Sequence, residues 1–72
     1  MEELLDCRGL KCPMPIVRAS QAIKAMGSGG RLRVISSDPA FRADIQAWTK
    51  QLGHKLVEFK DGPVQEAVTE KS

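Results

Sequence analysis

One short stretch decides how this chain folds: Gly9-Leu10-Lys11-Cys12-Pro13-Met14-Pro15-Ile16. Gly9 can adopt the positive φ that a tight loop requires. Pro13 and Pro15 are poor residues inside a helix, but the first helical turn tolerates them because its N–H groups have no helical partner. The stretch therefore predicts a loop that leads directly into a helix, with Cys12 where that helix begins.

The residues on either side of this stretch predict a strand and a helix. Residues 3–6, together with Cys7, form a short strand candidate. From Met14 to Met26, apolar residues recur at three- and four-residue spacing, which predicts a helix with one buried stripe. Residues 27–30 end it, since glycine accepts the left-handed conformation of a C-terminal cap. The stripe consists of Ile16, Ala19, Ile23 and Met26.

A second strand and a second helix follow. Residues 31–36 alternate between arginine and apolar side chains, which predicts a strand with Leu32 and Val34 on its buried face. The Ser37-Asp38-Pro39 sequence signals a helix start, with Asp38 as the N-cap and Pro39 as the first helical residue. This helix is expected to run to about residue 52. Its buried stripe is Phe41, Ile45, Trp48 and Leu52.

The last third of the chain predicts two strands joined by a hairpin. Residues 54–60 read as a third strand, with Val57 and Phe59 on one face. The Asp61-Gly62 pair is a hairpin signal, so an antiparallel strand should follow over residues 64–69. The pattern of that fourth strand is weak, because regular pairing places Glu66 on the same face as its valines.

The order of elements is βαβαββ, which indicates an α/β protein of the two-layer, α+β sandwich type. Strand–helix–strand units favour parallel pairing, and the hairpin adds an antiparallel pair. Because the strands are patterned on one face only, we expect a mixed four-stranded sheet with two helices on one face. Residues 1–72 are expected to form a single domain.

Composition excludes several kinds of site. The chain has two cysteines, one histidine and no Cys-x-x-Cys sequence, so we expect no metal site and no structural disulfide framework. No signal peptide is recognisable, and no apolar run approaches the roughly 20 residues that span a bilayer. The net charge of +2 is too small to indicate nucleic acid by itself. We therefore expect a cytoplasmic protein whose thiols stay reduced.

The position of Cys12 favours a reactive thiol. Helix N-termini and neighbouring cations lower the pKa of a cysteine and so increase its thiolate fraction. Lys11 is adjacent, Arg8 could fold back, and Pro13 and Pro15 stiffen the turn. The amide N–H groups of residues 14 and 16 are the ones that could meet the sulfur. The alternative for any cysteine is an inert, buried side chain, and this interpretation is kept for Cys7.

The sequence from Leu5 to Pro15, with its Cys-Pro-x-Pro core, resembles the TusA/SirA/YedF family of small sulfur-carrier proteins. The likeness extends over nearly the whole chain, including its length, its βαβαββ order and the Asp38-Pro39 pair. The resemblance implies a two-layer fold like that of the C-terminal domain of translation initiation factor three. It also implies that Cys12 accepts sulfane sulfur as a persulfide and passes it on.

The implied protein is a sulfurtransferase-type carrier rather than a complete turnover enzyme, and it needs no cofactor. A cysteine desulfurase or a rhodanese would supply the sulfur, and a DsrE/TusD-like or other thiol protein would accept it. Thiolation of tRNA, supply of molybdenum cofactor and sulfur oxidation are all compatible with such a relay. We expect a monomer that contacts neither nucleic acid nor membrane directly.

Two other functions stay open at this point. A redox or regulatory protein could use a Cys7–Cys12 disulfide, since a spacing of five residues permits one. A small RNA-binding module is the other, favoured by Arg31 and Arg33. The lone His54 is not expected to act as a catalytic base, because sulfur exchange between thiols does not require one.

Overall fold

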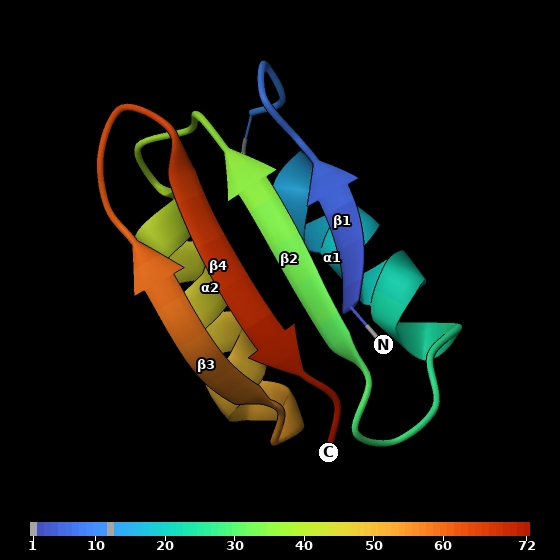
Figure 1. Ribbon diagram of the computed structural model, residues 1–72. Helices are drawn as coiled ribbons and strands as arrows, with labels where there is room; N and C mark the ends of the chain where they lie inside the picture. Colours follow the sequence, from blue (N-terminus) through green and yellow to red (C-terminus); the bar gives the residue numbers. More distant parts are fainter. Residues whose placement is uncertain (1, 12) are drawn as a thin grey trace.

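The computed structural model describes residues 2–11 and 13–72. The elements follow the expected order and have the bounds β1 Glu2–Asp6, α1 Met14–Lys24, β2 Arg31–Ser36, α2 Phe41–Leu52, β3 Lys55–Lys60 and β4 Gln65–Glu70. Figure 1 shows the four strands as one layer and the two helices as a second layer behind it. The predicted α+β fold is therefore confirmed.

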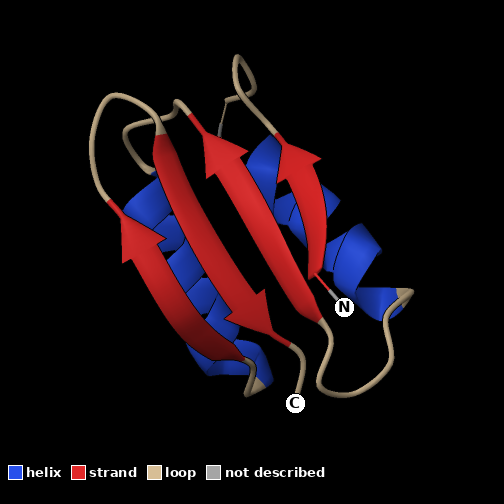
Figure 2. Ribbon diagram, in the orientation of Figure 1, coloured by secondary structure: helices blue, strands red, loops and turns tan. Residues whose placement is uncertain are grey.

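The strands are arranged in the order β1-β2-β4-β3. β1 pairs with β2 in parallel, as a strand–helix–strand unit requires, whereas β4 is antiparallel to both of its neighbours. Both helices cover the same face of this mixed sheet (Figure 2). The strand order, which the sequence left open, makes β2 and β4 the central strands.

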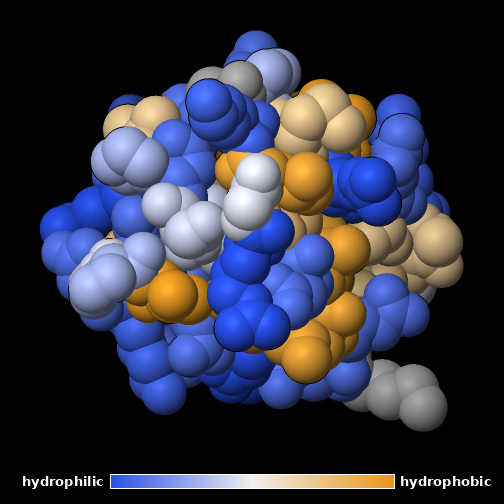
Figure 3. Space-filling model, turned by 90° about the horizontal axis from the view of Figure 1, so that it is seen from above, coloured by the Kyte–Doolittle hydropathy of each residue, from blue (hydrophilic) through white to orange (hydrophobic). Residues whose placement is uncertain are grey.

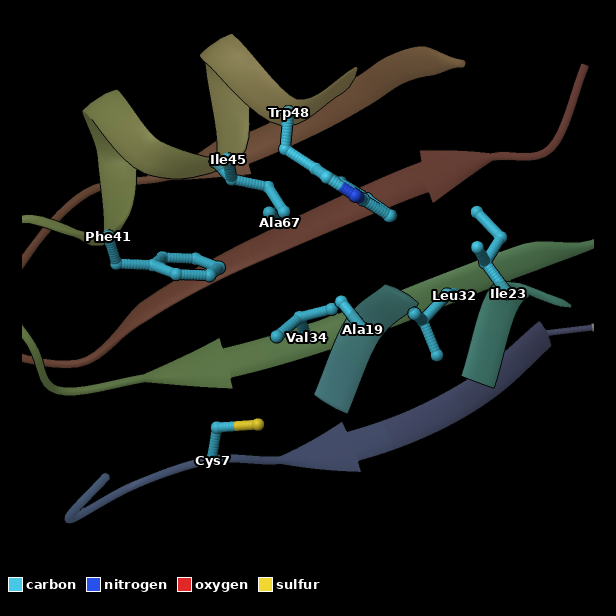
Figure 4. Packing of buried hydrophobic residues seen from close by; sticks show 9 residues of the cluster. All are labelled: Cys7, Ala19, Ile23, Leu32, Val34, Phe41, Ile45, Trp48 and Ala67. Carbon is cyan, nitrogen blue, oxygen red and sulfur yellow. The ribbon is translucent and has the colours of Figure 1, made fainter. Parts of the chain in front are cut away.

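The core lies between the two helices and the sheet. Ala19 and Ile23 of α1 and Phe41 and Ile45 of α2 are almost fully buried, and they face the central strands (Figure 4). Trp48 belongs to the same cluster, as predicted. The sheet contributes three further apolar side chains that are at most 1% exposed, namely Leu32, Val34 and Ala67.

The helix boundaries depart from the predicted ones. α1 ends at Lys24, two residues before Met26. α2 starts at Phe41 rather than Pro39, because Asp38 closes a turn ahead of the helix. The Asp38 Oδ1 atom accepts the Ala40 N–H at 3.2 Å, and the Asp38 carbonyl accepts the Phe41 N–H at 3.1 Å. Asp38 therefore caps this turn and not the helix itself.

The predicted α2 stripe is wrong at its last position. Leu52 is 51% exposed, whereas Thr49 is buried. A buried hydroxyl needs a hydrogen-bond partner, and that of Thr49 donates to the Ile45 carbonyl at 2.9 Å. The buried residues of α2 are therefore Phe41, Ile45, Trp48 and Thr49.

The two C-terminal strands also differ from a regular alternation. A register shift between Leu56 and Glu58 places Leu56 and Phe59 on the helix-facing side, so Val57 and Phe59 do not share a face. Such a bulge adds one residue to a strand and changes the side to which the following side chains point. Val57 is 40% exposed.

The helix-facing side of β4 carries small or polar residues, which explains its weak pattern. Gln65, Ala67 and Thr69 lie opposite the inward residues of β2 and are buried. Thr69 donates to the Leu32 carbonyl at 3.4 Å, which satisfies its hydroxyl group. Val64 precedes the strand and is 45% exposed.

The opposite face of the sheet carries ion pairs. Arg33 approaches Glu66 at 3.1 Å, Glu2 at 3.5 Å and Glu58 at 3.7 Å. Arg31 pairs with Glu70 at 3.3 Å. Among the described residues, no helix has both the length and the apolar character needed to cross a membrane.

Candidate functional site

Cys12 belongs to the loop between β1 and α1, which leaves the sheet at one end. Asp6, at the end of β1, pairs in register with Ile35 near the end of β2. The β1–α1 loop and the β2–α2 loop therefore emerge at the same end of the sheet (Figure 1), as the ends of neighbouring parallel strands must. His54 precedes β3 at the other end of the sheet.

Cys12 itself lies outside the described residues, so the predicted thiol site is defined here by its neighbours. Pro13 is the residue that precedes α1, and Pro15 occupies the first turn of that helix. The side chain of Pro15 is almost fully buried, whereas Lys11 and Pro13 are exposed. The first turn of α1 is therefore anchored in the core through Pro15, while the residues on both sides of Cys12 face solvent.

The amide N–H groups predicted to face the sulfur are already used by the backbone. The Met14 N–H donates to the Lys11 carbonyl at 2.8 Å, and the Ile16 N–H donates to the Pro13 carbonyl at 3.1 Å. The Pro13 carbonyl also accepts the Val17 N–H at 3.0 Å. Proline at position 15 removes one further donor. This prediction therefore needs correction, because a tight first turn satisfies both amides internally.

Arg8 is held by an acidic neighbour. Its Nη2 atom lies 2.8 Å from Asp6 Oδ2, and its Nε atom also donates to the Asp6 carboxylate. The same carboxylate accepts the Arg8 backbone N–H at 3.1 Å. These hydrogen bonds lower the pKa of Asp6 and raise that of Arg8. The Arg8 charge is thus balanced locally and helps to shape the first turn after β1.

Cys7 is a core residue. It is a free cysteine with 1% exposure, and Figure 4 shows it in the same cluster as Ala19 and Val34. Burial raises the pKa of its thiol, an effect that the Arg18 charge partly offsets and Asp6 reinforces. Its thiolate is therefore disfavoured, and the interpretation of Cys7 as an inert small apolar residue agrees with the structure.

A contact between two loops was not predicted. The Gly9 N–H donates to the Ser37 Oγ atom at 3.0 Å, although 28 residues separate them. Gly9 has a φ of +83°, as its place in a tight turn suggested. That these loops lie together could have been predicted, because they follow two neighbouring parallel strands, β1 and β2. No local sequence pattern identifies Ser37 as the acceptor.

The two loops form the walls of an open groove of about 490 Å³, lined by residues 9–11 and 37–39. Figure 3 views the molecule from this end and shows apolar surface interrupted by hydrophilic side chains. Among residues 2–11 and 13–72, no group of three or more His, Cys, Asp or Glu side chains is placed to hold a metal ion. What this end offers chemically is a loop in which the residues on either side of Cys12, Lys11 and Pro13, are exposed.

Comparisons with known proteins agree on one family. The family model described as "Sulfurtransferase TusA" matches residues 3–71. The "Sulfur carrier protein TusA" of Allochromatium vinosum is 45% identical over 60 residues, which cover 83% of this chain and 79% of that protein. A "Putative sulfur carrier protein" of Aquifex aeolicus is 46% identical over 63 residues, but this chain spans only 32% of its length.

A solved structure supports the same relationship. The crystal structure of the SirA-like protein from Desulfitobacterium hafniense matches with a TM-score of 0.83 and 29% sequence identity. The match covers 97% of this chain and 96% of that one. Because the family match extends over nearly the whole chain and the fold agrees, this chain belongs to the sulfurtransferase TusA family of sulfur-carrier proteins.

Proposed function

We propose that this protein carries sulfur as a persulfide on Cys12. The observation that carries the proposal is the family match over residues 3–71, within which Cys12 provides the thiol of the Cys-Pro-Met-Pro sequence. The neighbouring residues Lys11 and Pro13 are exposed, so the loop is open to another protein. Pro15 fixes the start of α1 in the core and limits the freedom of the residues just before it.

The transfer is an exchange between thiols. The Cys12 thiolate attacks the outer sulfur of a donor persulfide, the donor S–S bond breaks, and the donor leaves as a thiolate. A new S–S bond then holds the transferred sulfur on Cys12. An acceptor thiolate repeats the exchange, so one sulfur atom moves without net oxidation or reduction. Such exchange depends on the thiolate fraction and on access, and no base on the carrier is needed.

The donor and the acceptor are proposed by chemical class. A cysteine desulfurase or rhodanese fits the donor role, and a DsrE/TusD-like or other thiol protein fits the acceptor role. A relay toward tRNA thiolation, molybdenum cofactor or sulfur oxidation would use the same step. A monomer in a reducing cytoplasm would keep the thiol available to both partners.

The structure gives less support to the two alternatives. A Cys7–Cys12 redox pair would have to draw Cys7 out of the core, where it is 1% exposed. An RNA surface at Arg31 and Arg33 would compete with the glutamates that already neutralise both side chains. Stacking on bases is also disfavoured, because Phe41 and Trp48 are buried.

The test is the mass of the intact protein after incubation with a cysteine desulfurase and cysteine. We expect a gain of one sulfur atom that a reductant removes, and we expect Cys12→Ser to abolish it. Cys7→Ser is the matched control and should still load sulfur. Absence of any adduct on Cys12 with desulfurase and with rhodanese donors would refute the proposal.

A further inference from the structure

Within the described part of the chain, the loop that contains Cys12 makes few hydrogen bonds to the rest of the molecule, although Leu10 packs against the core. At its start, the Cys7 N–H donates to the Ile35 carbonyl of β2 at 2.7 Å. The Leu10 N–H donates to the Cys7 carbonyl at 3.1 Å, which is a hydrogen bond within the loop itself. Among the described residues, the bond from Gly9 to Ser37 is the one side-chain hydrogen bond that joins this loop to another loop.

Ser37 is itself held in place by its neighbours. The Asp38 N–H donates to the Ser36 Oγ atom at 3.1 Å, and Ser36 is fully buried. On the other side, Gln65 Nε2 of β4 donates to the Asp38 carbonyl at 3.1 Å, and Gln65 is 6% exposed. Two buried side chains therefore fix the backbone around Ser37, which places its exposed hydroxyl group beside the β1–α1 loop.

The position of Gly9 makes this bond effective. Gly9 is the left-handed residue of the turn, and an added Cβ would meet nothing within 4 Å. Its conformation is therefore set by the backbone and by the bond to Ser37, not by packing. Leu10 and Lys11 are the only residues between this anchored glycine and Cys12 in the sequence. An anchor so close to the thiol limits where the following residues can go.

We propose that Ser37 is a positioning residue, whose hydroxyl group holds the Cys12 loop in the arrangement suited to sulfur exchange. This inference rests on the proposed carrier function and assigns part of it to the β2–α2 loop. Ser37 does not touch the transferred sulfur. It acts through Gly9, and it also ties together the two walls of the groove beside the loop.

The first measurement tests the contact itself. In the full-length protein, Ser37→Ala should shift the Gly9 amide signal in a nitrogen–proton NMR spectrum and speed its hydrogen exchange. The Leu10 amide should change little, because its acceptor is a backbone carbonyl. Ser37→Thr retains the hydroxyl group and should restore the wild-type Gly9 signal. An unchanged Gly9 amide in Ser37→Ala would overturn the inference.

The second measurement tests the consequence for Cys12. Alkylation by iodoacetamide reports loop position without a sulfur donor, and tryptic mapping separates the two thiols because Arg8 and Lys11 lie between them. We expect Ser37→Ala to change the Cys12 alkylation rate and to slow sulfur loading roughly fivefold, the scale of one lost hydrogen bond. Ser37→Thr should restore both rates.

The matched control is Ser28→Ala, in the turn before β2 at the other end of the strand. It should leave both rates unchanged. If Ser37→Ala loads sulfur as fast as Ser28→Ala, the positioning role is wrong while the carrier function stands. If wild-type Cys12 takes up no sulfur from any donor, the carrier function fails first, and the role assigned to Ser37 fails with it.

Discussion

At the scale of single residues, the two cysteines show how position in the fold decides the use of a thiol. Cys7 directly follows β1 with its side chain in the core, and burial raises the pKa of that thiol. A buried thiol packs like a small apolar group and reacts slowly. Only five positions separate it from Cys12, so sequence distance alone does not distinguish a structural cysteine from a reactive one.

Burial of Cys7 predicts a pH dependence of folding stability. Its pKa is raised above the ordinary value of 9.0 in the folded protein, so the folded state binds the proton more tightly than the unfolded state. The stabilisation is complete at lower pH and is lost as the pH rises past the unfolded value, by at most about 1.4 kcal/mol per pH unit.

Urea unfolding between about pH 7.5 and pH 10 measures this effect. Wild type should lose more stability over that range than Cys7→Ala, because alanine has no thiol to ionise. Cys12→Ser is the control, and it should retain the steeper decline of wild type. Parallel curves for wild type and Cys7→Ala would contradict the assignment.

At the scale of elements, β3 shows why alternation predicts a strand better than it predicts which side chains are buried. The bulge after Leu56 lets Leu56 and Phe59 both face the helices, although they are three positions apart. The centre of the Phe59 ring lies 6.2 Å from that of Phe41, and the Arg42 guanidinium carbon lies over the Phe59 ring, 5.5 Å from its centre. Val57 points away from this cluster.

The bulge predicts unequal costs for two substitutions in one strand. Phe59→Ala should lower the free energy of unfolding by about 2–3 kcal/mol, since it removes a partly buried ring from the core. Val57→Ala should cost less than about 1 kcal/mol, because that side chain is largely exposed. Urea unfolding of both variants checks this. Equal losses of unfolding free energy in the two variants would contradict the bulge and favour the regular alternation, in which Val57 and Phe59 share a face.

The start of α2 shows a second limit of local patterns. Ser37-Asp38-Pro39 correctly signals a helix nearby, but Asp38 lies three residues before the first residue of the helix and its side chain closes the turn there. Aspartate can cap a helix or close a turn with the same oxygen, and the choice depends on what holds the loop. Here Gln65, which is distant in the sequence, binds the Asp38 carbonyl and favours the turn.

At the scale of the whole molecule, most of the fold could be predicted because the local signals agree with each other. The stripe on α1 and the alternation of β2 identify the layer between helices and sheet, and the Asp61-Gly62 pair identifies the last hairpin. The order of strands could not be predicted, since the buried side of β4 is Gln65, Ala67 and Thr69 and has no apolar pattern.

The candidate site was predictable only in part. Cys12 and its prolines form a motif by which the family can be recognised in the sequence, and the family match confirms that recognition. The contribution of Ser37 could not be recognised, because it depends on two loops meeting across 28 residues. The pairing of Arg8 with Asp6 was equally hidden, although the two residues are almost adjacent.

The placement of the chain ends predicts tolerance to fusion. Glu2 at the start of β1 and Glu70 at the end of β4 both lie opposite Arg31, at the end of the sheet far from the Cys12 loop (Figure 1). A small folded domain joined after Ser72 should therefore leave the Cys12 alkylation rate within about twofold of wild type. A large drop would show that the added domain reaches the loop.

The position of Glu2 and Glu70, far from the Cys12 loop, also determines how this domain could be joined to other domains. Glu2 and Glu70 lie at the end of the sheet that faces away from the Cys12 loop, so a linker at either end would leave that loop on the opposite side of the domain. Attached to a larger protein, the unit could swing between two reaction centres while remaining anchored. The Aquifex relative, of which this chain spans 32%, has the length for such an arrangement.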